Sequence, residues 1–237
     1  MNSINISGYK IIKANNIKFL NKVKKEYFKI ANQIGFDGTP NALNEVKPTQ
    51  LNKLNLNFNR NSKNVNFNLV NAFSKEIKKI LGKKIFLQRL PYLRAKKNDL
   101  KSTATVPHND CDYGHSHLGF NLWVPLFDIL DNEGIFIFDI ETSKKIYSTF
   151  KFDKHLSIHI ANHREGFKKK YIKLKYGEAI LFSNLCIHGA TTLEKKINRV
   201  SSNIHLQSFD VPMGEKSSDL FTIAQLNTLG RYTSKGI

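Results

Sequence analysis

Cysteine, methionine, tryptophan and acidic residues are all scarce in this chain of 237 residues. It has 2 Cys, 2 Met and 1 Trp, and its 19 Asp and Glu stand against 37 Lys and Arg. The two cysteines, Cys111 and Cys186, cannot form a disulfide framework and are not spaced as in a zinc knuckle. The start, Met1–Gly8, has no basic segment followed by an apolar run, as a secretory signal would have. We therefore expect a reducing, cytoplasmic environment.

Long apolar runs are also missing, because no stretch approaches the ~18 to 20 apolar residues that a membrane span needs. Hydrophobic residues still make up 41% of the chain, with 17 Phe and 8 Tyr, which predicts a globular protein with a substantial core. The excess of cations gives a net charge of +18 and suggests an acidic partner, small or polymeric. A compositional drift toward Lys, Asn and Ile explains the same excess, so charge alone does not identify a partner.

Hydrophobic periodicity divides the chain into a helical first part and a strand-rich remainder. Apolar residues recur at three- and four-residue steps over Ile17–Ile34 and Asn66–Leu81, which predicts two amphipathic helices, the second ended by Gly82. The Asn-rich segment Gly35–Ser62 is expected to be a loop, and Ser217–Leu229 a last helix. Short β-branched and aromatic runs predict strands at Ile85–Tyr92, Gly119–Phe127, Gly134–Ile140, His155–Ile160, Tyr171–Leu174, Glu178–Phe182 and Val200–Phe209.

These short strands are separated by turn residues, with no helix of convincing length between them. This pattern favours an antiparallel sandwich or barrel over alternating βαβ units. No repeat or change in composition divides the sequence, so we expect one domain over residues 1–237. In this arrangement residues 1–84 form a helical cover, 85–210 form the β core and 211–237 form a C-terminal extension.

Two histidines and an aspartate have the residue types of a metal site. His108 and Asp110 are two residues apart, and residues i and i+2 of an extended strand point to the same face. His188 follows the apolar run Ala179–Phe182, far along the chain. Two histidines and one carboxylate form a facial triad that leaves positions on an iron(II) ion open for substrate and dioxygen. A His-x-Asp pair alone is usually structural and a lone histidine usually packs in a core, so it is the combination that favours ligands.

Arg199 begins the last strong strand, a short way beyond His188. An antiparallel neighbour strand would carry Arg199 back alongside the histidine. Its guanidinium is a planar fork of donors that suits a bidentate pair with a carboxylate. A dicarboxylic cosubstrate that chelates the metal through its keto acid end needs such an anchor at its far end. The ordinary alternative is a surface charge at the end of a strand.

The order of these residues resembles the phytanoyl-CoA dioxygenase-like branch of the iron(II)/2-oxoglutarate oxygenases over Gln88–Phe209, about half of the chain. The motifs that carry the resemblance are, in order, His108-x-Asp110, Trp123-Val124-Pro125-Leu126, Gly177-Glu178-x-x-x-Phe182, His188-Gly189 and Asn198-Arg199-x-Ser201. The resemblance implies a mainly β fold, a double-stranded β-helix (jelly roll, cupin-like) core with the N-terminal helices packed on it. It also implies the cofactors Fe(II), 2-oxoglutarate and dioxygen.

The same resemblance implies a role for each matching residue. His108, Asp110 and His188 would be the catalytic residues that hold the iron, and Arg199 would bind the distal carboxylate of 2-oxoglutarate. Further cosubstrate contacts are implied for Ser201, Gln88, Trp123 and Asn121. For Trp123, core packing is an equally ordinary role.

The resemblance implies oxidative decarboxylation of 2-oxoglutarate to succinate coupled to attack on a C–H bond of the substrate. Halogenating relatives lack the metal-binding carboxylate, which this chain has at Asp110. We therefore expect hydroxylation, with desaturation and ring closure left open. The segment Asn132–Ile140 lacks the Pro-Gly-Ser-His motif of many relatives, and Gly114-His115-Ser116-His117 is unusual, which leaves the substrate open. The runs Gln88–Arg94 and Asn121–Leu126 are similar to oxygenases of carbohydrate and aminosugar gene clusters.

The basic composition favours a small anionic substrate, such as a phosphorylated, nucleotide-linked or carboxylated sugar, with Arg89, Arg94 or Arg164 near the mouth of the barrel. A nucleic-acid demethylase is a second candidate, although such relatives tend to carry a second arginine in the cosubstrate strand and Ser201–Ile204 has none. A third is a non-catalytic jelly-roll binding module, whose structural metal would have all its positions closed by protein ligands. Residues whose roles stay open, with packing as the ordinary alternative, are His115, His117, His205, Cys111 and Cys186.

Overall fold

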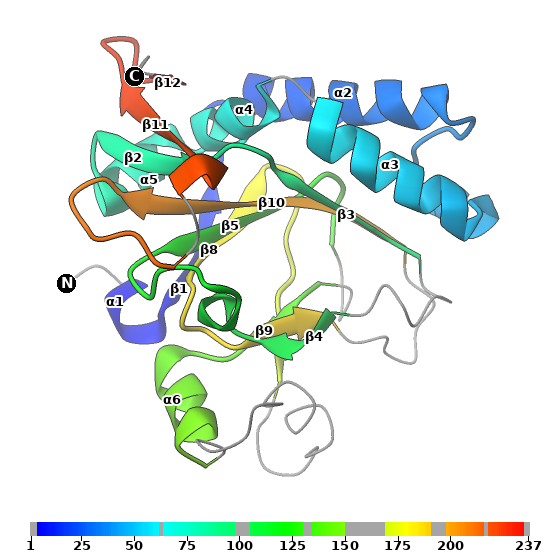
Figure 1. The fold of residues 1–237 in the computed structure, drawn as a ribbon. Coiled ribbons are helices and arrows are strands. Elements are labelled where there is room, and N and C mark those ends of the chain that lie inside the picture. Colours follow the sequence, from blue (N-terminus) through cyan, green and yellow to red (C-terminus); the bar gives the residue numbers. More distant parts are fainter. Residues whose placement is uncertain are drawn as a thin grey trace.

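Two antiparallel β-sheets face each other in the computed structural model of this chain, which describes residues 4–61, 64–97, 105–129, 134–149, 169–190, 198–215 and 218–234. Helices cover one face of the larger sheet, and the smaller sheet lies on its other side (Figure 1). None of the helices within the described ranges is long and apolar enough to cross a membrane.

The larger sheet has eight strands, which come from the whole length of the chain. In chain order they are β1 Tyr9–Lys13, β2 Lys84–Gln88, β3 Tyr92–Lys96, β5 Phe120–Pro125, β8 Glu178–Ser183, β10 Arg199–Ser208, β11 Phe221–Leu226 and β12 Tyr232–Ser234. Side by side they run β1-β8-β5-β10-β2-β11-β12. Strands β2 and β3 pair one after the other with the edge of β10 that faces away from β5.

The smaller sheet has four strands in the order β4-β9-β6-β7. They are β4 Thr105–His108, β6 Phe136–Ile137, β7 Lys170–Tyr171 and β9 His188–Ala190. From β3 to β10 the chain passes back and forth between the sheets, since β3, β5, β8 and β10 belong to the larger one and the others to the smaller one. This alternation is the topology of a jelly roll. The predicted mainly β, double-stranded β-helix fold with N-terminal helices packed on it is confirmed.

Strand β10 shows how the sequence pattern builds two different faces. Its apolar residues, among them Val200, Ile204 and Leu206, are buried in the core between the larger sheet and the helices. Because side chains alternate along a strand, the residues between them face the smaller sheet. That second row is polar and consists of Arg199, Ser201, Asn203, His205 and Gln207. The strand therefore carries a continuous polar row into the space between the sheets.

The predicted helix over Ile17–Ile34 is confirmed as α2, Ile17–Gln33, which buries Leu20, Val23 and Tyr27. A short helix, α1 Ile4–Ser7, begins the described part of the chain. The predicted helix over Asn66–Leu81 is divided into two helices, α4 Val65–Ala72 and α5 Ser74–Leu81. The second ends where expected, at Gly82, whose φ of 91° lies in the region that favours glycine.

The prediction of a loop over Gly35–Ser62 is wrong, because half of this segment is helix α3, Pro48–Asn61. Its apolar side chains Leu51, Leu54 and Phe58 are buried at helical spacing. Asparagine disfavours helices, which is why composition indicated a loop. Here two of the asparagines cover the open edge of β3: Asn59 Oδ1 accepts the Leu93 N–H at 2.7 Å, and Asn55 Oδ1 accepts the Ala95 N–H at 3.3 Å.

Three further predictions of secondary structure need correction. Gly134–Ile140 forms only the short β6 and then helix α6, Ile140–Thr149, so a helix does lie between the strands. The helix predicted over Ser217–Leu229 is wrong, since β11 and β12 form there and β11 extends the larger sheet by pairing with β2. Strand β1, which pairs with β8, was not expected. The strand predicted over His155–Ile160 lies outside the described residues.

Candidate metal centre

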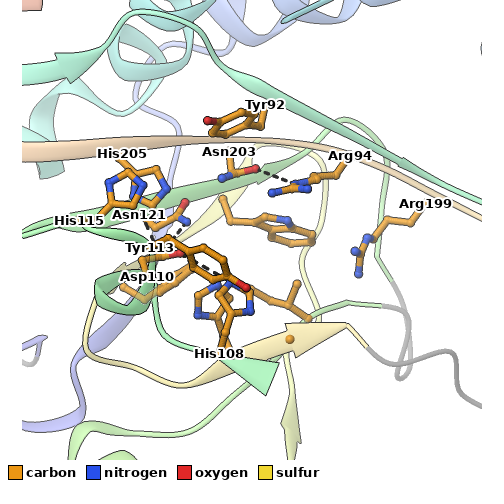
Figure 2. A pocket seen from close by; sticks show the side chains of 15 residues that line it. Tyr92, Arg94, His108, Asp110, Tyr113, His115, Asn121, Arg199, Asn203 and His205 are labelled. Carbon is orange, nitrogen blue, oxygen red and sulfur yellow. Dashed lines mark hydrogen bonds and ion pairs between the residues drawn. The ribbon is translucent and has the colours of Figure 1, made fainter. Parts of the chain in front are cut away.

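A cavity of about 410 Å³ opens between the two sheets (Figure 2). Most of its polar lining comes from the polar row of β10, from β3 and β5, and from the loop that follows β4. The lining residues are Tyr92, Arg94, His108, Asp110, Tyr113, His115, Asn121, Trp123, Ile135, Phe182, His188, Gly189, Arg199, Asn203 and His205. Asp110 is the one carboxylate among them.

Two neighbouring strands of the smaller sheet bring the histidines together. His108 ends β4 and His188 begins β9, and the two residues are direct partners in the antiparallel ladder. Their ring centroids lie 4.4 Å apart. Cross-strand partners hold their Cβ atoms within about 4.5–5.5 Å of each other, so this pairing alone puts both imidazoles at one place.

Asp110 reaches the histidines from a turn. We expected His108 and Asp110 on one face of a strand, but β4 ends at His108 and Asp110 is the first residue of a 3₁₀ helix, Asp110–Tyr113. Asn109 caps this helix, since its Oδ1 accepts the Asp112 N–H at 2.9 Å. The Asp110 N–H donates to the Asn184 carbonyl at 3.1 Å, which ties the turn to the segment before His188.

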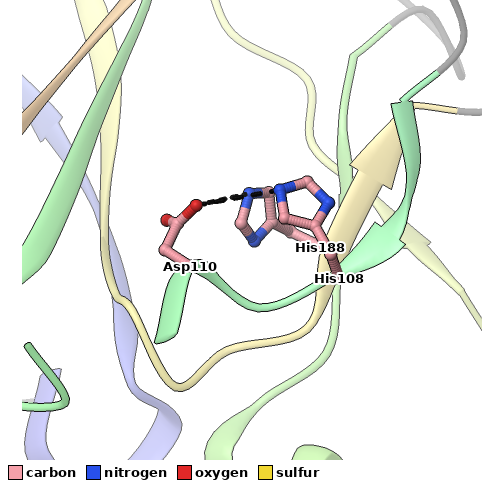
Figure 3. Close-up of side chains that lie close together, drawn as sticks. All are labelled: His108, Asp110 and His188. Carbon is pink, nitrogen blue, oxygen red and sulfur yellow. Dashed lines mark ion pairs between the residues drawn. The ribbon is translucent and has the colours of Figure 1, made fainter. Parts of the chain in front are cut away.

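The three side chains form the group that the sequence predicted (Figure 3). Asp110 Oδ1 lies 3.7 Å from His108 Nε2 and 3.8 Å from His188 Nε2. One ligand atom from each residue falls within 4.8 Å of the others, which suits a single metal ion. Three protein ligands beside a cavity leave further coordination positions for small molecules, as in catalytic rather than structural sites.

The hydrogen bond of His188 prepares its ring for a metal. Its Nδ1 lies 3.0 Å from the Cys186 carbonyl oxygen. A carbonyl only accepts, so Nδ1 must carry the hydrogen, and in the neutral ring the lone pair is then on Nε2, the atom that faces Asp110. Metal-binding histidines usually donate their other N–H to a carbonyl or carboxylate in this way. The donor set and its orientation therefore fit a divalent transition metal.

Asp110 is held in its ionised form. Burial, the largest influence, raises the pKa of this carboxyl. The attraction of His188, His205 and His108 in their protonated forms, with the hydrogen bond from Asn121, outweighs burial and lowers the pKa to about 2. Asn121 Nδ2 donates to Asp110 Oδ2 at 3.1 Å, while Oδ1 faces the two histidines. One carboxylate oxygen is thus engaged by protein and the other is directed at the metal position.

Arg199 lies at the other end of the cavity from His115 and His205 (Figure 2). We expected it on a strand next to His188, but β10 pairs with β2, β3 and β5, so Arg199 faces the cavity from the opposite sheet. The side chain is buried, with its guanidinium carbon 5.3 Å from the centroid of the Trp123 ring. Burial and the nearby charge of Arg94 lower the pKa of Arg199 to about 10, so it is a cation at neutral pH.

Two more cations lie beside Arg199 on β3. In the ladder Arg199 pairs with Lys96, and Ser201 pairs with Arg94. Lys96 Nζ donates to the Ala190 carbonyl at 3.1 Å, and burial, followed by the charge of Arg199, lowers its pKa to about 8. Arg94 Nε donates to Asn203 Oδ1 at 3.4 Å, which orients its guanidinium at the cavity. This cationic end attracts anions.

Two of the other four predicted cosubstrate residues line the cavity, and two do not. Trp123 and Asn121 line the cavity with Arg199, whereas Ser201 is fully buried beneath its surface and Gln88 lies outside it. Gln88 Oε1 accepts the His205 N–H at 3.0 Å, at the point where β10 is paired with neither β2 nor β3. Cosubstrate contacts by these residues stay predictions.

Several cavity residues were left undecided or missed by the sequence. His115 and His205 line the cavity and stack, with ring centroids 3.5 Å apart and planes 18° apart, but His117 does not line it. Asn203 was missed, although its position in the alternating polar row of β10 could have revealed it. Tyr92 carried no such signal. The two cysteines stay outside the lining, and burial raises the pKa of the Cys111 and Cys186 thiols to about 11 and 12.

No family model and no curated protein matches this chain, whereas 167 chains of solved structures do. The non-heme monooxygenase ThoJ, in a nickel complex, is 13% identical with a TM-score of 0.57, over 98% of this chain and 86% of that chain. The non-heme alpha-ketoglutarate-dependent carbocyclase SnoK from nogalamycin biosynthesis is 11% identical with a TM-score of 0.56, over 93% of each chain.

A third solved structure is HygX from Streptomyces hygroscopicus with nickel and 2-oxoglutarate bound. It is 13% identical with a TM-score of 0.50, over 92% of this chain and 90% of that chain. At such low identity these likenesses establish the fold. The chain therefore has the fold of non-heme enzymes of this kind, which is the fold that its motifs implied.

Proposed function

We propose that this protein is an iron(II)- and 2-oxoglutarate-dependent dioxygenase that hydroxylates a small polar or anionic metabolite, such as an intermediate of sugar biosynthesis. One observation carries the proposal: a cluster of two histidines and one carboxylate shares a single cavity with a buried arginine on the facing sheet. The proposal treats residues 1–237 as one oxygenase domain in the cytoplasm, a compartment that suits the two free cysteines.

His108, Asp110 and His188 would hold the iron. Iron(II) with bound 2-oxoglutarate supplies the activation of dioxygen, coupled to decarboxylation of the cosubstrate to succinate and carbon dioxide. The chain itself fixes the ligands, through the Cys186 carbonyl on His188 and the Asn121 amide on Asp110. A halogenating enzyme needs a free position on the metal for a halide. Because Asp110 would occupy that position here, hydroxylation is the proposed outcome.

Arg199 would bind the carboxylate of 2-oxoglutarate that is remote from the metal. The guanidinium is buried, and a charge-assisted hydrogen bond in a water-poor cavity is stronger than one at the surface. The Trp123 ring beside it supports the planar guanidinium and excludes water. ThoJ was solved with nickel and HygX with nickel and 2-oxoglutarate, which supports a cavity of this shape for such ligands.

The substrate class follows from the charge of the cavity. Arg94 lines the cavity together with Arg199, and the carboxylate among its described lining residues, Asp110, belongs to the candidate metal cluster. If Arg199 binds the cosubstrate, Arg94 can bind an anionic group of the substrate. The hydrogen bond from Arg94 to Asn203 holds the Arg94 guanidinium in place. Arg164, a third candidate for this role, lies outside the described residues.

Anaerobic titration of iron(II) and 2-oxoglutarate tests the proposal. The parent protein should develop the visible charge-transfer band of a chelated keto acid, and it should form succinate when oxygen is admitted. His188→Ala should lose the band, and Arg199→Ala should require more 2-oxoglutarate to reach it. His117→Ala, which changes an exposed histidine outside the cavity, is the matched control and should behave like the parent. No band at any metal loading would refute the proposal and favour a non-catalytic jelly-roll module.

A further inference from the structure

A second cavity, of about 450 Å³, adjoins the first on the side of α3. It lies between that helix, the turn from β2 to β3 and the start of β11, and the surface it exposes is mostly apolar. Its lining residues are Leu56, Asn59, Arg60, Gln88, Arg89, Leu90, Tyr92, His115, Asp219, Leu220 and Phe221. A cavity of a few hundred Å³ is the size that small molecules occupy.

Three large leucines are left exposed at this one place. Leu56, Leu90 and Leu220 are 48%, 50% and 45% exposed, and they come from three separate segments of the chain. Single exposed leucines are ordinary, but a group that converges on one cavity indicates a surface that is covered when a ligand binds.

Three polar side chains that line this cavity are engaged by backbone groups. Arg89 Nε donates to the Phe221 carbonyl at 2.7 Å, and Asn59 Oδ1 accepts the Leu93 N–H. The Gln88 side chain is likewise engaged, since its Oε1 accepts the backbone N–H of His205. These hydrogen bonds hold the lining segments together. The apolar side chains are left to face the cavity.

Tyr92 and His115 line both cavities and so form the wall between them. The wall stands where the edge of β10 is interrupted, because β3 pairs with β10 up to Asn203 and β2 pairs with it only from Leu206 onward. His115, stacked on His205, lies at the end of the first cavity remote from Arg199 (Figure 2). The apolar space therefore begins on the opposite side of the metal cluster from the cationic end.

We infer that the substrate of the proposed oxygenase is amphiphilic, with a polar or anionic part at the metal cluster and an aliphatic or aromatic part in the second cavity, against Leu56, Leu90 and Leu220. This inference rests on the proposed function and narrows its substrate class. The shared wall favours a single molecule that extends past Tyr92 and His115 from one cavity to the other.

A neutral apolar probe, para-trifluoromethyl benzyl alcohol, tests the second cavity without metal, cosubstrate or turnover. Fluorine NMR should show saturable binding to the parent protein. Leu90→Gln and Leu220→Gln should each raise the dissociation constant roughly fivefold to tenfold, because each removes a leucine from the apolar contact. Ile11→Gln is the control, since Ile11 is 44% exposed on β1 at the far edge of the sheet, and it should leave binding unchanged.

Manganese(II) then locates the probe relative to the metal cluster. With manganese(II) bound, the fluorine signal of the bound probe should relax much faster than with zinc(II), and His188→Ala should abolish the difference. Three outcomes would overturn the inference and leave the proposed function intact. The first is that all three glutamine variants weaken probe binding alike, and the second is that the probe shows no saturable binding. The third is that the parent protein is a dimer that Leu90→Gln dissociates. Loss of the charge-transfer band with probe binding retained would overturn the proposed function, and with it the link between this cavity and an oxygenase substrate.

Discussion

Replacing Arg199 with glutamine is expected to weaken 2-oxoglutarate binding and, at the same time, to stabilise the protein. Burial and the charge of Arg94 both lower the pKa of Arg199, to about 10. A cation that is desolvated and repelled in this way opposes folding. A residue kept for packing or pairing behaves in the opposite manner, because its removal destabilises. The two effects together therefore separate an anion anchor from a structural arginine.

The pKa values give the size of the effect. Burial, followed by the charge of Arg94, lowers the pKa of Arg199 from 12.5 to about 10, and each pH unit corresponds to about 1.4 kcal/mol. Since a buried amide keeps part of the desolvation penalty, we expect Arg199→Gln to raise the free energy of unfolding by about 1 to 2 kcal/mol near neutral pH. A charged hydrogen bond contributes about 1.5–3 kcal/mol, so the dissociation constant of 2-oxoglutarate should rise about 10- to 100-fold.

The pH dependence supplies a second signature of the same substitution. The folded-state pKa of Lys96, about 8, lies below its ordinary value of 10.5, so between these values the unfolded state binds more protons. The stability of the parent should therefore rise with pH across that window. In Arg199→Gln the repulsion is gone, the pKa of Lys96 moves back up, and the rise should be smaller.

Urea unfolding followed by circular dichroism, together with calorimetric titration of 2-oxoglutarate into metal-loaded protein, measures both effects. Arg231→Gln is the control, because Arg231 is exposed and packs over the Phe19 ring away from the cavity. A destabilised Arg199→Gln that binds 2-oxoglutarate as tightly as the parent would refute the reasoning. It would make Arg199 a structural cation.

Three other substitutions have effects that follow directly from contacts. His188→Ala should abolish binding of one cobalt(II) ion, seen as loss of its visible spectrum. Asn121→Ala should lower metal affinity about 10- to 100-fold in the same titration, because Asp110 loses the hydrogen bond that orients it; unchanged affinity would remove Asn121 from the site. Asn59→Ala should lower the free energy of unfolding by about 1–3 kcal/mol in urea, because the Leu93 N–H at the sheet edge loses its acceptor; equal stability would show that water replaces the amide.

The three residues of the candidate metal cluster could be predicted to lie together because their residue types are unusual in combination, even though the expected geometry was partly wrong. His108 and Asp110 were placed together by their spacing, but a capped turn after β4 rather than one strand face brings them there. Likewise Arg199 reaches the cavity from the sheet opposite His188. In both cases the sequence identified which groups meet, and only the pairing of strands determined how they meet.

Secondary structure was predicted well where burial alone decides it and poorly where a tertiary contact overrides local preference. The continuous apolar run of β8 and the apolar alternation of β10 were sufficient to locate both strands. Helix α3 was missed because its asparagines disfavour a helix in isolation, and two of them are satisfied only by the edge of β3. Strands β1 and β11 were missed because a strand at the margin of a sheet depends on its partner more than on its own pattern.

If Arg199 binds the cosubstrate as proposed, the division of the site between two sheets gives the jelly roll a direct part in cosubstrate choice. The metal cluster belongs to the smaller sheet and its flanking turn, whereas Arg199 projects from the larger one. Packed sheets lie about 10 Å apart. A short dicarboxylate that chelates a metal at one sheet can reach a guanidinium on the other, while a monocarboxylate that occupies the metal makes no contact with Arg199. Burial, followed by the charge of Arg94, lowers the pKa of Arg199, and a distal carboxylate bound there would counteract both influences. The proposed role of Arg199 therefore predicts selectivity for a dicarboxylic cosubstrate, through sheet spacing combined with like charge.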